Sequence, residues 1–561
     1  PVNSTWRHRI PDPGYFLYFE RYPRYLYRAD ELTLRRYVQA SQFVQAEAYR
    51  YMLESLRRRK PAASGLFIWE YNEPWPAMRH SIIDWYGRPK QSYYWFKRAA
   101  RELLLTASFK RVVWNAGEEF HARVWLSTIV GCNTGQQVRA VAILRDSKWR
   151  VLMRQEAKVT VQSESFEAMC IQWQIPRHYR GALFLELVIH AQRGTSNVYP
   201  FTVFPLPRQE LARALLISDA PYEEETLVGY LGSFGISVSR VRAYGKKINL
   251  PYPALNDFLS HYDSVILGPM WDPKKQLGAR QLRLIASAVR KGMGLVVLNQ
   301  SYDYGGKFRL NLSQLKGTEL GKILPVIIPA KWNPAFHSEA VQNHWIAQDS
   351  ALREVHLPKF FILPSHGLSR LKEGRMIMSV NKTPVVLDRQ VGTGRVVVFL
   401  GGYVGKFIST FMRSWTSYYG FITRLVLHSA QRADAKALSA IGRCEPERLF
   451  APLAHLPDAS VTVEAPSTIV LKKGQGHMTV KLTNTSDAIA LYVQLTLNAG
   501  NMLTNMSDNF LILPPNTSKT VGVNLESAST NYRYSHIARL MIQGWNISKH
   551  SKTIDIVRRK S

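Results

Sequence analysis

The 561-residue sequence has little cysteine and no long apolar run. Its three cysteines, Cys132, Cys170 and Cys444, are too few for a disulfide-stapled scaffold or a four-cysteine metal site. No stretch approaches the roughly 18 consecutive apolar residues of a membrane span. The chain starts at Pro1, with no initiating Met and no signal-like segment after it, so we expect the C-terminal part of a longer protein.

Acidic residues are scarce relative to basic ones. The 41 Asp and Glu face 73 Lys and Arg, which gives a formal net charge of +32. Such an excess raises the hypothesis of nucleic-acid binding. The basic residues are spread along the chain, however, and their densest runs, residues 57–60 and 558–560, close an expected helix and end the chain. Because no nucleic-acid-binding motif accompanies them, we predict no specific nucleic-acid partner.

Hydrophobic residues make up 46% of the chain and aromatic residues 11%, which is ample for several packed cores. Residues 31–56 have the period of an amphipathic helix, and residues 91–105 are expected to form another. Between them, residues 65–69 form a short apolar run typical of a strand covered on both faces. The expected apolar face of the first helix consists of Leu34, Val38, Ser41, Gln45, Ala48, Met52 and Leu56.

The remaining chain changes period twice. Residues 106–205 alternate with a period of two, as in residues 121–128, which indicates an immunoglobulin-like β-sandwich. In residues 206–433 apolar strands alternate with helices, which favours an open and mostly parallel α/β sheet. Residues 457–561 return to alternation and predict a second β-sandwich. The strands expected in the α/β segment are residues 214–218, 264–267, 295–298 and 395–400.

The stretch from residue 65 to 99 carries a family resemblance. It contains a glycine, an apolar strand and Trp, then Asn, Trp-Pro, an Asp-Trp-Tyr run and Arg-Pro-Lys before a helix. This order resembles the last barrel strand and helix of glycoside hydrolase family 2, in its β-mannosidase-like and exo-glucosaminidase-like branches. Upstream, Gln42, Gln45 and Glu47 resemble the family's seventh helix. The matching positions are Gly65, Trp69, Asn72, Trp75, Pro76, Asp84, Trp85, Tyr86, Arg88, Pro89, Lys90 and Tyr94.

The resemblance implies a multidomain fold. Residues 1–105 would be the C-terminal remnant of a (β/α)8 barrel with helix seven, strand eight and helix eight, and a β-sandwich would follow. Retaining glycosidases use two carboxyl groups about 5–5.5 Å apart. In this family both come from barrel strands four and seven, which would precede Pro1. The chain would then supply part of a sugar site and scaffolding without either catalytic carboxylate, and an incomplete barrel would expose apolar surface and self-associate.

Four residues are candidates for sugar binding, and alternatives stay open for three of them. Trp69 either stacks on a sugar ring or belongs to the core. Glu73, in an Asn-Glu-Pro sequence, is an outside candidate for a catalytic acid/base. It is otherwise a loop carboxylate neutralised by Arg79 or Arg88, or a contact to a sugar hydroxyl. Trp75 either faces the sugar or packs the loop. The candidate substrate-binding set is Trp69, Asn72, Glu73 and Trp75.

A second resemblance is carried by three short runs, residues 262–268, 291–298 and 392–399. With them, residues 206–433 resemble class I glutamine-amidotransferase-like domains of the flavodoxin-like α/β type. Working amidotransferases use a cysteine nucleophile, and all three cysteines lie outside this segment. We therefore expect a structural module, or one through which the chain forms a homo-oligomer.

Neither a metal nor an organic cofactor is implied. The spacings of His337, His344, His356 and His366 do not fit a helical metal pair. The expected partner is an oligosaccharide or glycoconjugate, cleaved by the parent glycosidase at a terminal β-linked sugar, with β-mannosides first. The competing hypothesis is a non-catalytic carbohydrate-binding or assembly protein.

Overall fold

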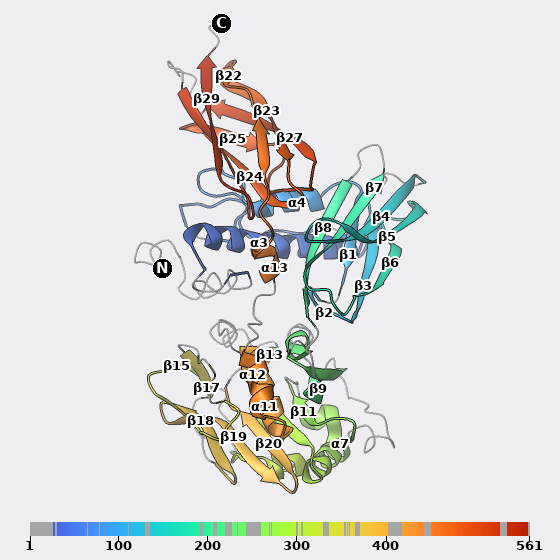
Figure 1. Cartoon of the computed structure of the whole chain (residues 1–561), viewed down its shortest axis with the longest axis vertical. Helices are drawn as coiled ribbons and strands as arrows, with labels where there is room; N and C mark the ends of the chain where they lie inside the picture. The colour runs from blue at the N-terminus through green and yellow to red at the C-terminus, as the bar shows by residue number, and fades with distance from the viewer. Residues whose placement is uncertain are drawn as a thin grey trace. The chain divides into compact units, whose positions relative to one another are not determined.

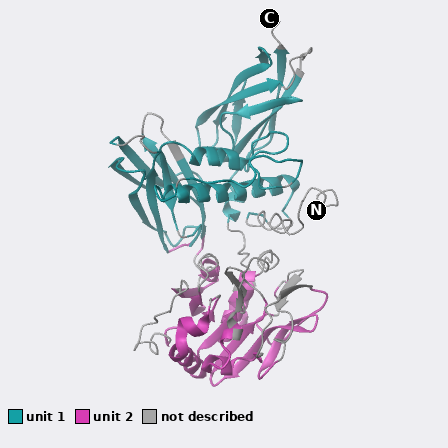
Figure 2. Ribbon diagram, turned by 180° about the vertical axis from the view of Figure 1, so that it is seen from behind, with its two compact units in different colours: residues 1–114, 118–203, 449–561 teal, residues 115–117, 204–448 magenta. Residues whose placement is uncertain are grey.

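The structure is a computed structural model of the chain (Figure 1). Contacts divide it into two units, coloured separately in Figure 2: the first comprises residues 1–114, 118–203 and 449–561, and the second residues 115–117 and 204–448. The first unit therefore combines the two ends of the sequence. The described residues are 26–27, 31–63, 65–77, 79–109, 111–129, 135–190, 195–205, 210–218, 227–232, 234–242, 260–268, 270, 272–298, 301–304, 307–328, 336–352, 355, 357, 360–364, 371–401, 418–442, 450–527 and 536–558.

Two helices of the first unit, α3 (Leu34–Arg57) and α4 (Gln91–Ala99), pack on each other. Helix α3 begins after Thr33, whose side chain accepts a hydrogen bond from the N–H of Arg36 at 3.3 Å, as an N-cap residue does. Phe43 of α3 is fully buried and meets Trp95 of α4 edge to face, with 5.9 Å between ring centroids. This aromatic contact positions α4 against α3.

The buried face of α3 is not the one that we predicted from the sequence. Leu34, Val38 and Met52 of the predicted face are exposed. The pattern misleads because half of the buried residues are charged and count as polar. Arg50 pairs with Glu47, and Arg57 donates to four backbone carbonyl oxygens, so both charges find partners inside the protein. The buried residues are Ala40, Phe43, Ala46, Arg50, Glu54 and Arg57.

Two predictions next to these helices are also wrong. The helix expected over residues 91–105 ends at Ala99, because Leu104–Ser108 pairs as strand β1 with strand β3 (Glu119–Ser127). Residues 65–69 form no strand, and Phe67 and Trp69 are 99% and 77% exposed. A strand needs a neighbour for its N–H and C=O groups. Within the described part of the chain, no strand pairs with this segment.

The β-sandwich predicted after α4 is present. One sheet has the order β1-β3-β6 and the other β2-β8-β7-β4-β5. The predicted alternation on β3 is confirmed, since Phe120, Ala122, Val124 and Leu126 are fully buried, and Phe120 contacts Phe201 of the opposite sheet. The strands are β1 Leu104–Ser108, β2 Val113–Asn115, β3 Glu119–Ser127, β4 Gln137–Asp146, β5 Val151–Thr160, β6 Ser165–Gln174, β7 Gly181–His190 and β8 Thr195–Phe204.

The second unit contains an eight-stranded sheet with the order β10-β9-β11-β12-β20-β19-β18-β16. The first five strands pair in parallel, as predicted, and include all four strands expected from the sequence. The other edge is antiparallel, which the sequence did not predict. Strands β11 and β12 are buried throughout, which explains their unbroken apolar runs.

The strands of the second unit are β9 Ala212–Ser218, β10 Ile236–Arg242, β11 Ser264–Leu267, β12 Gly294–Leu298, β13 Ser301–Tyr304, β14 Lys307–Leu310, β15 Phe336–Ala340, β16 His344–Ile346, β17 Phe360–Pro364, β18 Arg375–Val380, β19 Thr383–Val391 and β20 Gly394–Phe399. Its helices include α7 Pro273–Arg290, α8 Asn311–Gln314, α9 Glu319–Ile323, α11 Tyr418–Ser429 and α12 Ala435–Gly442.

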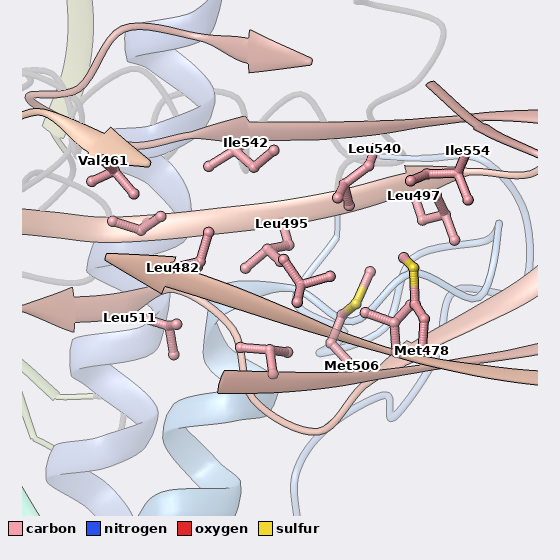
Figure 3. Close-up of a cluster of buried hydrophobic side chains, with 14 of the residues drawn as sticks. Val461, Met478, Leu482, Leu495, Leu497, Met506, Leu511, Leu540, Ile542 and Ile554 are labelled. Carbon is pink, nitrogen blue, oxygen red and sulfur yellow. The ribbon is translucent and has the colours of Figure 1, made fainter. Parts of the chain in front are cut away.

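The second predicted sandwich is present at the C-terminal end, after α13 (Ala451–Ala454). Its sheets have the orders β21-β23-β27-β25 and β22-β29-β28-β24-β26. Figure 3 shows part of the buried cluster to which both sheets contribute side chains, for example Leu482 from β23 and Leu540 from β28. The strands are β21 Val461–Glu464, β22 Thr468–Leu471, β23 Gln475–Asn484, β24 Ala490–Asn498, β25 Met502–Met506, β26 Leu511–Leu513, β27 Ser518–Ser527, β28 His536–Gln543 and β29 His550–Arg558.

Candidate functional site

The candidate residues lie on the 65–90 loop, the segment of residues 65–90 that leads from α3 to α4. Side chains of α3 hold this loop. Gln45 donates a hydrogen bond to the carbonyl oxygen of His80 at 2.6 Å, and the Tyr49 hydroxyl donates to the same oxygen at 3.1 Å. Ser92, at the start of α4, donates to Oε1 of Gln45 at 3.0 Å. The Gln45 side chain therefore connects the loop to both helices. The loop carries Trp69, Asn72, Glu73 and Trp75.

Backbone hydrogen bonds fold the loop on itself. The N–H groups of Ile82 and Ile83 donate to the carbonyl oxygen of Tyr71 at 3.2 and 3.1 Å, and the N–H of Glu73 donates to Ile83 at 3.2 Å. The N–H of Lys90 donates to Ile82 at 2.9 Å, and the Ile82 side chain is buried. The first and last parts of the loop are thereby held together, although residues 65–69 form no strand.

Glu73 is the buried carboxylate of this loop, only 4% exposed. Its Oε1 atom accepts a hydrogen bond from Ser81 Oγ at 2.9 Å and forms an ion pair with the Lys90 ammonium. Lys90 also donates to the carbonyl oxygen of Arg79 at 3.3 Å. The cation is thus Lys90 and not Arg79 or Arg88, the two that we predicted. A general acid/base must reach the substrate, so this burial favours the structural interpretation of Glu73 over the catalytic one.

Glu70 has a cation of its own. Its Oε1 atom pairs with Arg79, and its backbone has a φ of 64° in the left-handed region, which non-glycine residues rarely adopt. Burial lowers the pKa of the neighbouring His80, although Glu70 acts against that shift. Glu70 and Glu73 are therefore each bound to a separate cation, whereas Asp84, the third carboxylate of the loop, accepts a hydrogen bond from the backbone N–H of Arg88 at 2.8 Å.

The aromatic side chains of the loop are largely in solvent. Trp69 is 77% exposed, so its interpretation as a core residue is wrong, and Trp75 is 37% exposed. Asn72 is exposed as well. Large exposed aromatic groups often mark a binding surface, since their exposure is unfavourable in water. Our list of candidates missed four further exposed aromatics, although they follow from the aromatic density of residues 67–86: Phe67, Tyr71, Trp85 and Tyr86.

Outside the loop we considered metal ligands, membrane-spanning helices and nucleophilic thiols in the described residues. Among them no three His, Cys, Asp or Glu residues come together as a metal site would require. No helix of the described chain is long and apolar enough to cross a membrane. Cys170 is a free thiol whose Sγ lies 3.2 Å from Nε2 of His121. Four residues considered in the sequence analysis lie outside the described residues: Cys132, Cys444, His356 and His366.

Comparison with known proteins finds sequence similarity to glycoside hydrolases in parts of this chain. Residues 443–547 match the family described as the exo-beta-D-glucosaminidase Ig-fold domain. Beta-mannosidase B of Aspergillus flavus is 26% identical over 138 residues, which are 20% of this chain and 16% of that protein. Beta-mannosidase B of Aspergillus oryzae gives the same values.

Two solved structures are similar as well. The exo-chitosanase CsxA of Amycolatopsis orientalis is 12% identical with a TM-score of 0.40, over 93% of this chain and 35% of that one. The Beta-D-Mannosidase from Dictyoglomus thermophilum is 12% identical with a TM-score of 0.30, over 94% of this chain and 32% of that one. The chain thus spans only about a third of these proteins.

The sequence matches confirm the predicted resemblance to the C-terminal portion of family 2 glycoside hydrolases. The amidotransferase-like interpretation of residues 206–433 remains a prediction.

Proposed function

We propose that the chain is the C-terminal part of a retaining glycoside hydrolase that removes terminal β-linked sugars, with β-mannosides as the first substrate class. The observation that carries this proposal is the 65–90 loop, which exposes Trp69 and Trp75 while Glu70 and Glu73 are paired with cations of the same loop. An indole can stack on the apolar face of a sugar ring. The match to beta-mannosidase B supports the choice of substrate.

The chain's own contribution would be sugar binding and support of the barrel. Retention needs two free carboxyl groups about 5–5.5 Å apart, whereas Glu70 and Glu73 are bound to cations and leave Asp84 as the one loop carboxylate without an ion pair among the described residues. This supports the inference that the nucleophile and the acid/base come from other parts of the parent protein. Residues 65–69 would pair there as the last barrel strand, which would cover Phe67. Trp69, Asn72 and Trp75 would then contact the sugar, and Glu73 would position the loop or contact a sugar hydroxyl.

We extend the proposal to the division of the chain. Residues 1–105 would be the end of the barrel, residues 106–205 and 457–561 two sandwiches, and residues 206–433 an amidotransferase-like module without a nucleophile. The absence of cysteine from residues 206–433 supports a structural or self-association role for that module.

The test compares turnover and binding in the 561-residue chain. We expect no turnover of chromogenic β-mannosides or β-glucosaminides, but saturable binding of a β-mannan oligosaccharide in calorimetry. Trp69→Ala should weaken that binding about tenfold, the equivalent of one stacking contact of about 1.4 kcal/mol. Trp345→Ala, which removes an exposed indole from the second unit, is the matched control. If the chain hydrolyses one of these substrates and Glu73→Gln abolishes that hydrolysis, then Glu73 is catalytic and the proposal is wrong.

A second candidate is a non-catalytic carbohydrate-binding or assembly protein. The pairing of Glu70 and Glu73 with cations is the observation that favours it. Both functions predict oligosaccharide binding that depends on Trp69. They differ in the activity of the parent protein, because a non-catalytic binding protein would hydrolyse no β-linked substrate.

A further inference from the structure

A small cavity of about 90 Å³ lies inside the first unit, apart from the 65–90 loop. Helices α3 and α4 and strands of both sandwiches contribute to its wall. A cavity needs roughly 10–15 Å³ to hold one water molecule, so this one admits a group of several heavy atoms. Its polar and aromatic lining includes Arg50, Glu54, Trp95, Arg98, Arg101 and Lys519.

Most charged groups around the cavity already have partners. Arg50 pairs with Glu47 and donates to the carbonyl oxygen of Val198 at 2.6 Å. Glu54 accepts hydrogen bonds from Asn197 at 2.8 Å and from the Tyr199 hydroxyl at 2.7 Å. Because these groups satisfy one another, they add little net attraction for a ligand.

The three other cations at the cavity, Arg98, Arg101 and Lys519, have one carboxylate near them, that of Asp508. Arg98 and Lys519 share Asp508, at 2.6 and 2.8 Å. Among the described residues, no carboxylate lies within ion-pair distance of Arg101, and its guanidinium donates no hydrogen bond. Burial lowers the pKa of Arg101 and the like charge of Arg98 adds to that effect, whereas the Asp508 carboxylate acts against it. Arg101 is therefore a partly buried charge without a counter-ion in contact.

Trp95, which lines the same cavity, carries an unsatisfied hydrogen-bond donor. Trp95 is only 4% exposed, and its Nε1 atom has no hydrogen-bond acceptor among the described residues. Buried donors are nearly always paired in folded proteins. Two residues that line one cavity, Trp95 with its unpaired indole N–H and Arg101 with no ion-pair partner among the described residues, point to a ligand that accepts hydrogen bonds and carries negative charge.

The end of α4 does not oppose such a ligand. The carbonyl groups at the C-terminal end of a helix repel anions, and Arg98 and Arg101 lie at that end of α4. Arg57, however, donates to the carbonyl oxygen of Ala99 at 3.1 Å and to that of Arg101 at 2.5 Å. These hydrogen bonds offset the negative end of the helix dipole.

We propose that this cavity binds one small oxyanion of the phosphate or sulfate class. Arg101 supplies the main charge and the Trp95 N–H a hydrogen bond, while Arg98 and Lys519 add positive potential beside Asp508. The bound anion links α4 to both sandwiches, since residues of all three line the cavity. The site is independent of the proposed glycosidase function, so it survives if that function is wrong.

The test uses inorganic phosphate and sulfate on the whole chain at pH 7, with chloride at matched ionic strength as the reference. We expect saturable binding in calorimetry and a higher Tm for the first unit with either oxyanion. Arg101→Gln should weaken binding at least tenfold, and Trp95→Phe severalfold. Lys158→Gln removes the same charge from an exposed position on β5 and should bind like the unsubstituted chain. A hexose phosphate and acetate, tested in parallel, distinguish a free oxyanion from a phosphorylated sugar or a carboxylate.

Two results would overturn the proposal: no saturable effect of phosphate or sulfate beyond that of chloride, or equal affinity in Arg101→Gln and the unsubstituted chain. Crystals soaked in selenate give a readout that needs no variant, in case Arg101→Gln does not fold. An anomalous peak inside the cavity supports the site, whereas an empty cavity at saturating selenate contradicts it.

Discussion

The terminal sandwich and the 65–90 loop are both rich in large apolar side chains, but the loop leaves most of its large aromatic side chains in solvent whereas the sandwich buries its core. On β23, Met478, Val480 and Leu482 alternate and are buried, because β21 and β27 pair with this strand and a second sheet covers it. Phe67 and Trp69 also alternate, yet both lie in solvent. An apolar pattern therefore specifies burial only where the rest of the fold supplies a covering surface.

The two regions also differ in what stabilises them. The sandwich has a continuous apolar core, whereas the loop is held by backbone hydrogen bonds and by the pairing of Glu73 with Lys90. Substitutions in the two regions should consequently have different costs, and the experiments below run from the largest expected effect to the smallest.

The largest effect is expected from Leu540→Ala in the sandwich core. Leu540 is fully buried on β28, so truncation should lower the free energy of unfolding of the first unit by about 2–5 kcal/mol. Leu503→Ala is the matched control, because Leu503 is exposed on β25 and should change it by less than about 0.5 kcal/mol. Urea unfolding measures both variants. Equal costs would show that this core is not what stabilises the sandwich.

A smaller effect is expected from Glu73→Gln in the loop. The change leaves the Lys90 ammonium without its counter-charge and should destabilise the loop by about 1–3 kcal/mol. Hydrogen exchange at the amides of Glu73 and Lys90 measures the local opening. Adding Lys90→Met should recover part of the loss, since the pair is then removed as a whole. Glu526→Gln, at an exposed position on β27, should leave the exchange unchanged; faster exchange there would make the loop effect nonspecific.

A pH effect is expected where the sandwich meets α4. Burial alone would raise the pKa of Asp508, but Arg98 and Lys519 outweigh it and hold the pKa below its usual range. A depressed carboxyl pKa stabilises the folded protein above the unfolded value of about 3.9, and this contribution is lost as the pH falls through the folded pKa. Asp508→Asn should therefore reduce the loss of stability below about pH 4 by roughly 1 kcal/mol. Asp487→Asn, at an exposed position, should keep the full pH dependence of stability. If this control reduced the pH dependence as much as Asp508→Asn, the effect could not be assigned to Asp508.

The smallest effect on stability is expected from Phe67→Ser. Because this side chain is already in water, its replacement should change the free energy of unfolding by less than about 0.5 kcal/mol. Self-association of the chain, measured by sedimentation velocity, should nevertheless decrease, since an exposed apolar group is removed. A large loss of stability would show that Phe67 is covered in solution.

Sequence patterns correctly predicted the strands whose buried side chains alternate regularly or form an unbroken apolar run. The alternation of Phe120, Ala122 and Val124 correctly gave the face of β3, and the apolar runs at β11 and β12 correctly gave central strands. The same reasoning found α3 but chose its wrong face, because Arg50, Glu54 and Arg57 are buried with partners distant in sequence.

The candidate site was predictable in position but not in contacts. The aromatic loop was recognisable from its composition, and Lys90 was part of the motif that carries the family resemblance. The pairing of Glu73 with Lys90 was not predictable, because 17 residues separate them and only the folding of the loop brings them together.

By itself the sequence determined the two sandwiches, the α/β sheet between them and the likeness to family 2 glycoside hydrolases, because side-chain periodicity and residue order are local properties of a chain. Only the tertiary structure decided which face of α3 is buried, that Phe67 and Trp69 are exposed, and that Arg101 and Trp95 line one cavity. These outcomes depend on which distant segments supply covering surface and counter-charge, and a linear pattern carries no record of them.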